Sequence, residues 1–61
     1  MPFIDVKIYD RRLDENSERE LIERLTQAVV DVFGEPVRPQ TWVTLTGVPP
    51  RQWGIGGVQG G

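Results

Sequence analysis

The sequence contains no cysteine and no histidine among its 61 residues. The missing cysteines exclude a disulfide framework and a thiol nucleophile, and the missing histidines remove the usual neutral-pH base and a common metal ligand. The N-terminus has no basic stretch followed by an apolar run, and no apolar run approaches about 18 residues, so we see neither a secretory signal nor a membrane span. We therefore expect a cytoplasmic protein without a metal site and without a membrane partner.

Positive charge is also scarce. Seven Lys and Arg residues against nine Asp and Glu residues give a net charge of −2, which argues against a nucleic-acid partner. A hydrophobic content of 38% and a charged content of 26% are typical of a folded domain. A chain this short removes only about 60% of its unfolded surface from water, so its own core is marginal. Because disulfides and metals are absent, we expect one small domain, residues 1–61, that is stabilised by oligomerisation.

A strand is predicted near the N-terminus, at residues 3–9. The residues there alternate between two sides, with Ile4, Val6 and Ile8 on one side and Phe3, Asp5, Lys7 and Tyr9 on the other. Alternation with period 2 and β-branched residues indicates a half-buried strand. The polar residues 10–16 then interrupt the alternation and predict a loop.

An amphipathic helix is predicted to follow and to end at Phe33. Its apolar stripe recurs with helical spacing and comprises Leu21, Ile22, Leu25, Ala28, Val29, Val32 and Phe33. Ser17 followed by Glu20 is typical of a capping box, and Asp14 is an equally good cap, so the helix begins near 14 or 17. Gly34 and Pro36 are suited to its end.

The remaining residues predict a second strand at about 40–46 and a glycine-rich tail at 47–61. A strand, a helix and a strand form a βαβ unit with two parallel strands, so the fold class is α/β (α+β). The tail suggests a short hairpin or an extended arm, in which Ile55 and Val58 have little of their own chain to cover them. One helix leaves the other face of the sheet open, and we expect another copy to cover it.

Several motifs together resemble the 4-oxalocrotonate tautomerase family of the tautomerase superfamily. These are the Met1-Pro2 start, the arginines after the first strand, Gly34-Glu35-Pro36 and the closing Trp53-Gly54-Ile55-Gly56-Gly57, within a βαβ pattern of family length. The resemblance covers nearly the whole chain. It implies a cofactor-independent isomerase that forms a homohexamer, a trimer of dimers, and it leaves a hetero-oligomer open.

The resemblance assigns the catalytic base to the amino-terminal proline, Pro2, after Met1 has been removed. A free prolyl nitrogen is a secondary amine, and an apolar setting lowers the pKa of an amine towards neutrality because it penalises the charged form. A chain without histidine thereby still has a base. While Met1 is attached, the Pro2 nitrogen is an amide without basicity, and Pro2 is then only a rigid first residue of a strand.

The resemblance also implies a substrate-binding arginine and an aromatic wall. Arg12 is the best match to the loop arginine that holds a substrate carboxylate, and Arg11 is the alternative. Either of them is otherwise a solvated loop residue. Trp53 matches the aromatic side chain that excludes water from the proline, and it is equally suited to anchor a subunit interface.

The second strand departs from the family pattern. Where known members carry a second arginine that polarises the substrate carbonyl, this sequence has Thr41 and Trp42, so efficient turnover of a dicarboxylate is not expected. Trp42 either lines an enlarged apolar pocket for an aryl substrate or covers the sheet at an interface. Arg38, in the preceding loop, is the further pocket candidate, and Arg51 resembles an exposed turn residue.

Two functions are compatible with these residues. The first is a tautomerase that moves a proton in a 2-hydroxy-dienoate or a 2-oxo acid, with Pro2 as the base, a carboxylate-bearing small molecule as substrate and no cofactor. The second is a non-catalytic subunit or binding module of a tautomerase-like oligomer, which a retained Met1 and the missing arginine favour.

Overall fold

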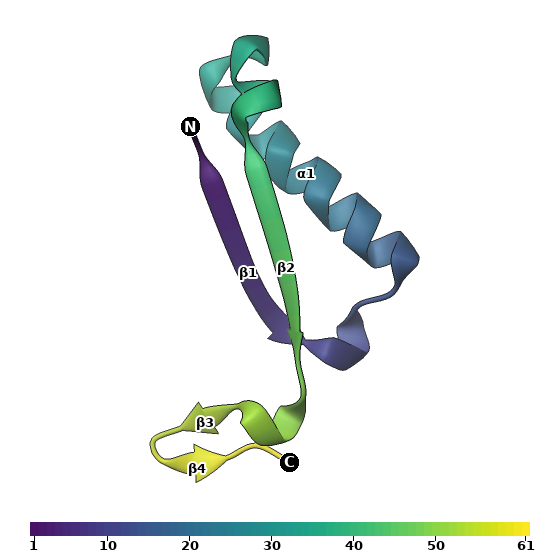
Figure 1. The fold of residues 1–61 in the computed structure, drawn as a ribbon, viewed down its shortest axis with the longest axis vertical. Coiled ribbons are helices and arrows are strands. Elements are labelled where there is room, and N and C mark those ends of the chain that lie inside the picture. Colours follow the sequence, from purple (N-terminus) through teal and green to yellow (C-terminus); the bar gives the residue numbers. More distant parts are fainter.

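A computed structural model describes residues 1–61 (Figure 1). Its elements, with η for short 3₁₀ helices, are β1 (Phe3–Tyr9), η1 (Asp10–Arg12), α1 (Glu15–Phe33), η2 (Glu35–Gln40), β2 (Trp42–Val48), η3 (Pro50–Gln52), β3 (Gly54–Ile55) and β4 (Val58–Gln59). No helix in it is long and apolar enough to cross a membrane, and no cluster of three or more His, Cys, Asp or Glu side chains could hold a metal ion.

The two long strands are parallel and run side by side, with α1 crossing one face of the pair (Figure 1). Phe3 pairs with Trp42 and Tyr9 pairs with Val48, so the whole of β1 is matched to the whole of β2. The side of β1 that carries Ile4, Val6 and Ile8 is half-buried. The predicted βαβ unit and the predicted strand at 3–9 are therefore confirmed.

The start of α1 is fixed by Asp14 and Ser17. The Asp14 carboxylate accepts a hydrogen bond of 2.8 Å from the Ser17 N–H, and the Ser17 hydroxyl oxygen accepts one of 2.9 Å from the Asp14 N–H. This reciprocal capping box satisfies two backbone donors at the helix start, so the earlier of the two predicted caps is the observed one. At the other end, the N–H of Gly34 donates to the carbonyl of Val30, and Gly34 adopts φ 92°, which favours glycine.

The second strand begins two residues later than predicted. Residues 35–40, which contain Pro36 and Pro39, form η2, so the predicted start at 40 is wrong and β2 begins at Trp42. Proline fixes its own φ and lacks a donor, which favours the turn over the strand. At its other end β2 extends to Val48, so Gly47 and Val48 belong to the strand rather than to the tail.

The tail forms a hairpin at the lower end of the molecule in Figure 1. Strands β3 and β4 are antiparallel, and the turn residues Gly56 and Gly57 have φ values of 60° and 82°. Two successive positive φ angles characterise the type I′ turn that matches the twist of a hairpin. Ile55 and Val58 are 77% and 71% exposed, as the sequence predicts.

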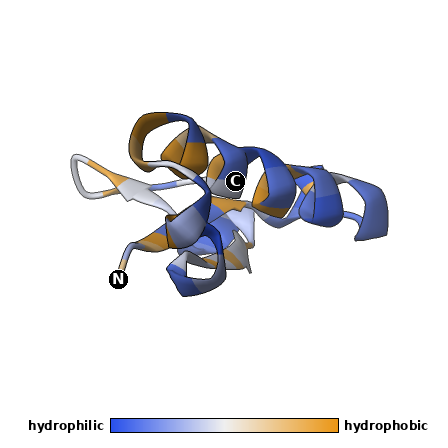
Figure 2. Cartoon of the chain, turned by 90° about the horizontal axis from the view of Figure 1, so that it is seen from above, coloured by the Kyte–Doolittle hydropathy of each residue, from blue (hydrophilic) through white to orange (hydrophobic).

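The chain on its own has almost no core. Val30, at 5% exposure, is the one buried residue of the 61. Orange and blue alternate along the turns of α1 in Figure 2, as expected for an amphipathic helix, but the predicted stripe is only partly covered. Leu21, Leu25 and Val29 are half-buried, whereas Val32 and Phe33 are more than 70% exposed. Apolar surface on the open sheet face also remains uncovered, since Phe3 and Trp42 are 59% and 54% exposed.

Candidate active site

A cleft of about 630 Å³ lies at the N-terminal end of β1. Its lining consists of Met1, Pro2, Phe33, Pro36, Val37 and Gln40. None of these side chains carries a charge, and most are apolar. The cleft arises because Pro36 and Val37 in η2, which turns back beside the end of α1, lie close to the first residues of β1 (Figure 1).

Pro2 is half-buried at this cleft and is held there through its backbone. The carbonyl of Pro2 accepts a hydrogen bond of 3.0 Å from the N–H of Trp42. Trp42 is therefore adjacent to Pro2 along the sheet, and its half-exposed side chain lies on the open face beside Phe3. Of the residues predicted for the site, Pro2 and Trp42 are brought to the same end of the molecule.

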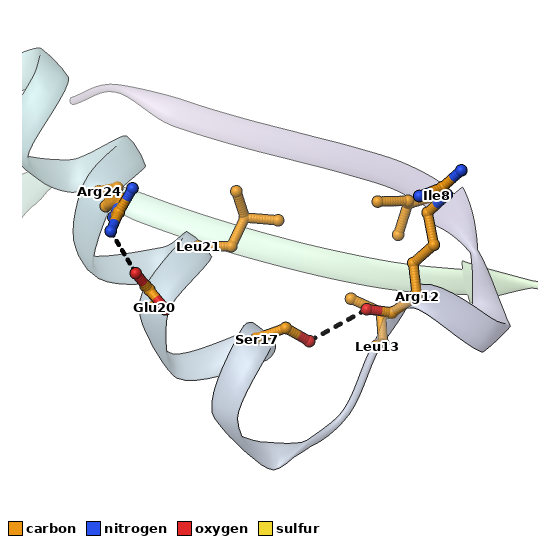
Figure 3. Close-up of a pocket in the computed structure, with 7 residues that line it drawn as sticks. All are labelled: Ile8, Arg12, Leu13, Ser17, Glu20, Leu21 and Arg24. Carbon is orange, nitrogen blue, oxygen red and sulfur yellow. Dashed lines mark hydrogen bonds and ion pairs between the residues drawn. The ribbon is translucent and has the colours of Figure 1, made fainter.

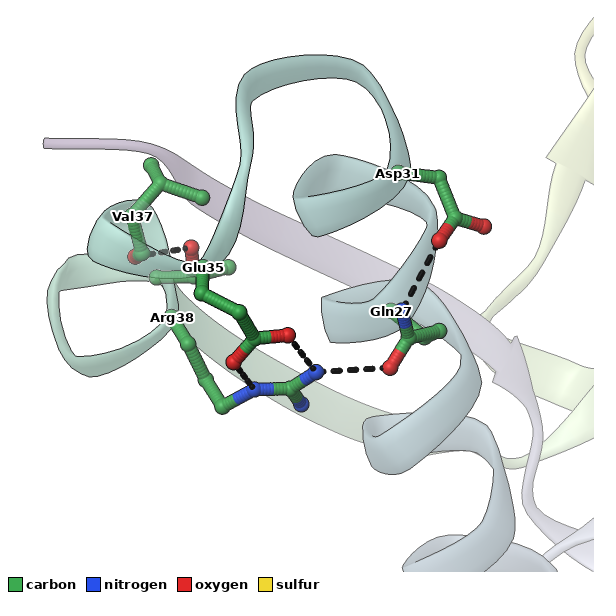
Figure 4. A network of polar contacts seen from close by, with 6 residues as sticks. Gln27, Asp31, Glu35, Val37 and Arg38 are labelled. Atoms are coloured by element: carbon green, nitrogen blue, oxygen red, sulfur yellow. Dashed lines mark hydrogen bonds and ion pairs between the residues drawn. The ribbon is translucent and has the colours of Figure 1, made fainter.

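Arg38 also belongs to this end, but its guanidinium is occupied. Its Nε and one terminal nitrogen donate to the two oxygens of Glu35, each at 3.0 Å, and the same terminal nitrogen donates to Gln27 at 2.6 Å (Figure 4). The hydrogen bond from Arg38 lowers the pKa of the Glu35 carboxyl, and the same contact raises the pKa of Arg38. The bidentate pair lies within η2, and the hydrogen bond to Gln27 fastens η2 to α1. Arg38 is not among the residues that line the Pro2 cleft.

Trp53 lies at the opposite end of β1, in a stack of three side chains. Its ring centroid is 5.0 Å from that of Tyr9, with the planes inclined at 46°, and the guanidinium carbon of Arg11 is 4.9 Å from the Tyr9 centroid. The indole N–H of Trp53 donates to the carbonyl of Val48 at 3.1 Å. Arg11 is thereby placed beside the aromatic side chains by a cation–π contact.

Arg12 points into a separate cleft of about 270 Å³ between the end of β1 and the first turns of α1 (Figure 3). The lining residues are Ile8, Arg12, Leu13, Ser17, Glu20, Leu21 and Arg24. The carbonyl of Arg12 accepts a hydrogen bond from the Ser17 hydroxyl at 3.1 Å, while its side chain extends towards Ile8. Arg24 is paired with Glu20. The two loop arginines thus have different neighbours, Arg11 the aromatic stack and Arg12 this cleft.

The predicted site residues therefore form two groups at opposite ends of β1. Pro2 and Trp42 are at its start, and Arg11, Arg12 and Trp53 are at or beyond its end. The seven residues of β1 extend over about 20 Å, so one chain does not bring Pro2 together with Arg11 or Arg12. The sequence did not predict that Tyr9 belongs to the aromatic stack. The only feature that pointed to it was its place on the same side of β1 as Phe3, Asp5 and Lys7. The sequence also did not predict the Arg38 ion pair, for which the spacing of Glu35 and Arg38 was a signal.

Comparisons with known proteins agree with this fold. The family profile for tautomerases, described as "Tautomerase enzyme", matches residues 2–60. A solved structure from a kinetic and structural characterisation of 4-oxalocrotonate tautomerase isozymes of Methylibium petroleiphilum is similar, with 34% identity and a TM-score of 0.79. The match covers 95% of this chain and 90% of that chain. No curated protein sequence matches significantly.

The chain belongs to the tautomerase family, because the family profile covers nearly all of it. The βαβ unit with its small C-terminal hairpin is the tautomerase fold. Membership supports a tautomerase-type isomerase, and proteins of this family are typically oligomeric and bind small substrates.

Proposed function

We propose that the protein is a cofactor-independent tautomerase whose base is the secondary amine of Pro2, freed when Met1 is removed. The observation that carries this proposal is the position of Pro2 in an apolar cleft that no charged side chain lines. Met1 is 76% exposed, which leaves it open to an aminopeptidase. In the reaction, the amine takes a proton from the enol oxygen or the activated carbon of a 2-oxo acid and returns it to another atom of the substrate.

The surroundings of Pro2 favour an amine that is neutral at physiological pH. An ordinary α-amino group has a pKa of about 8, and an apolar cleft lowers it because the charged form is poorly solvated there. A nearby carboxylate would oppose this effect, but none lines the cleft. The hydrogen bond from the Trp42 N–H fixes the position of the Pro2 carbonyl. The rigid pyrrolidine ring then sets the position of the Pro2 nitrogen.

A cation for the substrate carboxylate has to come from outside this chain. Arg38 is committed to Glu35 and Gln27, and Arg11 and Arg12 lie at the far end of β1. We propose that a second copy supplies Arg12 or Arg11 to the Pro2 cleft, and its Trp53 as the wall that excludes water. This arrangement accounts for an oligomeric enzyme, and the homohexamer implied by the family resemblance provides such contacts.

The lining of the cleft favours one substrate class over another. Phe33, Pro36 and Val37 offer apolar surface in the cleft. Thr41 or Trp42 stands where relatives have a second arginine, so the cation is missing from this strand. A 2-oxo acid with one carboxylate and an apolar or aryl group therefore fits better than a dicarboxylate. We expect kcat/KM for the enol of phenylpyruvate to exceed that for 2-hydroxymuconate.

The second candidate is a non-catalytic subunit of a tautomerase-like oligomer. The occupied guanidinium of Arg38 and the absence of a cation at the Pro2 cleft favour it. It differs from the first in one measurable respect, since it requires no free amine at Pro2.

The test combines intact-mass spectrometry with a tautomerase assay on the same sample. Protein without Met1 should convert phenylpyruvate enol, and an N-terminally extended form, in which Pro2 keeps an amide nitrogen, should lose activity by about 100-fold or more, as expected for loss of a general base. The matched control is the same extension placed after Gly61, which leaves the amine free. Full activity of the N-terminally extended form, or none in protein shown to lack Met1, would contradict the proposal.

A further inference from the structure

Two charged residues adjoin the Pro2 cleft without lining it. Pro36 and Val37 of η2 line the cleft, and the residues next to them in the chain are Glu35 and Arg38. Figure 4 shows both charged side chains turned towards Gln27 of α1, whereas the side chain of Val37 points away from them. The acid and the base of η2 therefore meet outside the cleft.

Arg38 holds the Glu35 carboxylate by both of its oxygens. Nε of Arg38 donates to one oxygen and a terminal nitrogen donates to the other, each at 3.0 Å. The same terminal nitrogen donates to the Gln27 side chain at 2.6 Å, and the Gln27 amide nitrogen donates to Asp31 at 2.8 Å. An exposed ion pair constrains its partners weakly by itself, but the bidentate geometry and the third contact to α1 fix the direction of this one.

The other elements at this end bring no unpaired carboxylate to the cleft. Asp31, on α1, belongs to the same network. Asp5 is the first charged residue of β1, and Lys7 Nζ donates to it at 2.8 Å. The residues of β2, from Trp42 to Val48, include no charge. The direction of Glu35 therefore decides whether the cleft stays free of negative charge.

A carboxylate in the cleft would act against the Pro2 amine as a base. The Cα atom of Glu35 is about 3.8 Å from that of Pro36, a lining residue, so a freed Glu35 side chain can turn to the cleft. A nearby negative charge raises the pKa of an amine because it stabilises the protonated form. The effect is strong in an apolar cleft, where little water screens the charges. The amine would then be mostly protonated at neutral pH and unable to accept a proton.

We propose that Arg38 is a positioning residue, which holds the Glu35 carboxylate on the side of η2 that faces Gln27 and so keeps a negative charge out of the Pro2 cleft. The consequence for catalysis rests on the proposed function, whereas the placement of charge does not depend on turnover. The hydrogen bond from Arg38 also lowers the pKa of the Glu35 carboxyl, so Glu35 is ionised throughout the neutral range and its direction matters there. The proposal accounts for a cation that lies near the cleft but does not face a substrate.

Titration of the Pro2 amine by ¹⁵N NMR tests this role without substrate. A chain that begins at Pro2 is short enough for chemical synthesis, which provides the free amine and places ¹⁵N at Pro2 alone. Arg38→Met frees Glu35 and should raise the pKa of the amine by at least about half a unit. Glu35→Gln leaves the positive charge of Arg38 unopposed and should lower this pKa. The double variant Arg38→Met/Glu35→Gln removes both charges and should titrate like the original protein.

Arg24→Met is the matched control. Arg24 is paired with Glu20 beside the other cleft, so this variant loses the same charge from an ion pair that does not adjoin Pro2. Its amine should titrate like that of the original protein. A role of Arg38 in the shape of η2 alone would shift Arg38→Met and the double variant alike, because both lack the guanidinium that contacts Gln27. That result would overturn the proposal, as would an unchanged pKa in Arg38→Met or shifts of the same sign in the two single variants.

Two further measurements keep the outcome unambiguous. Circular dichroism checks that each variant folds, and if Arg38→Met does not, Glu35→Gln decides, since a raised or unchanged pKa there contradicts the proposal. In active protein, the pH profile of kcat/KM should move in the same direction as the pKa of the amine. Because the titration needs no turnover, inactive protein that shows the expected shifts would contradict the proposed function and leave the role of Arg38 intact.

Discussion

At the scale of single residues, Asp14 has the clearest link between geometry and stability. Its carboxylate caps α1, and the hydrogen bond from the Ser17 N–H is the largest of the effects that lower its pKa. The folded state therefore favours the ionised carboxylate more than the unfolded state does. The resulting stabilisation is complete above the unfolded pKa of about 4 and is lost as the pH falls through the lower, folded pKa.

Replacement of Asp14 by Asn tests this linkage. Asparagine still caps a helix but does not titrate, so the melting temperature of Asp14→Asn should fall less steeply than that of the original protein below about pH 4. Asp5 and Glu35 titrate in the same range and are common to both proteins, so the difference between the two curves isolates Asp14. Thermal melts followed by circular dichroism from pH 7 to pH 2 measure it. Parallel curves would show that the cap carries no pH dependence.

The family resemblance predicted the candidate chemistry but not the grouping of the residues in space. Pro2, Arg11, Arg12 and Trp53 were proposed as site residues because they match motifs of that family. Their separation along β1 depends on the length and direction of the strand, which only the fold provides. The hydrogen bond from Arg38 to Gln27 was also beyond the sequence, since it joins residues 11 positions apart.

At the scale of elements, the C-terminal hairpin depends on two glycines. Gly57 has φ 82°, while a Cβ added there would meet nothing within 4 Å, so only the backbone conformation opposes a side chain. Gly57→Ala should therefore open the hairpin. A left-handed residue other than glycine costs about 1 kcal/mol, and protection of the Val58 and Gly60 amides from hydrogen exchange should fall about fivefold.

Gly54→Ala is the matched control for that change. Gly54 also has open space around it but does not have a positive φ, so its replacement should leave amide protection equal or slightly raised. Equal effects of the two substitutions would mean that the turn does not require glycine. The Gly60 N–H donates to the carbonyl of Trp53 at 2.8 Å, so an open hairpin also loosens the backbone at Trp53.

Elements whose apolar residues recur with a regular spacing were predicted well. Burial that depends on packing against other elements was not. Alternation gave β1 its observed limits, and the cap residues gave α1 a start that matched one of two alternatives. The apolar stripe of α1 omitted Val30, the one buried residue, and included the exposed Val32 and Phe33. A single stripe assumes one packing surface, whereas α1 contacts both β2 and η2.

At the scale of the whole molecule, the isolated chain is too open for its size. Its surface of 4720 Å² compares with about 4,000 Å² for a compact monomer of this mass. Its radius of gyration of 14.3 Å compares with about 10.5 Å for a compact chain of 61 residues. The excess corresponds to the uncovered apolar side chains of the open face, the end of α1 and the hairpin. We expect association with further copies to remove this surface from water.

Folding and association should therefore be coupled, and the melting temperature should rise with protein concentration. A hundredfold increase in concentration shifts a folded dimer by about 2.7 kcal/mol, which corresponds to about 10 °C for two chains of this length. Differential scanning calorimetry from about 2 to 200 μM measures the shift. A melting temperature that does not depend on concentration would instead require a stable monomer, in which a single buried valine and a half-covered helix hold the fold together.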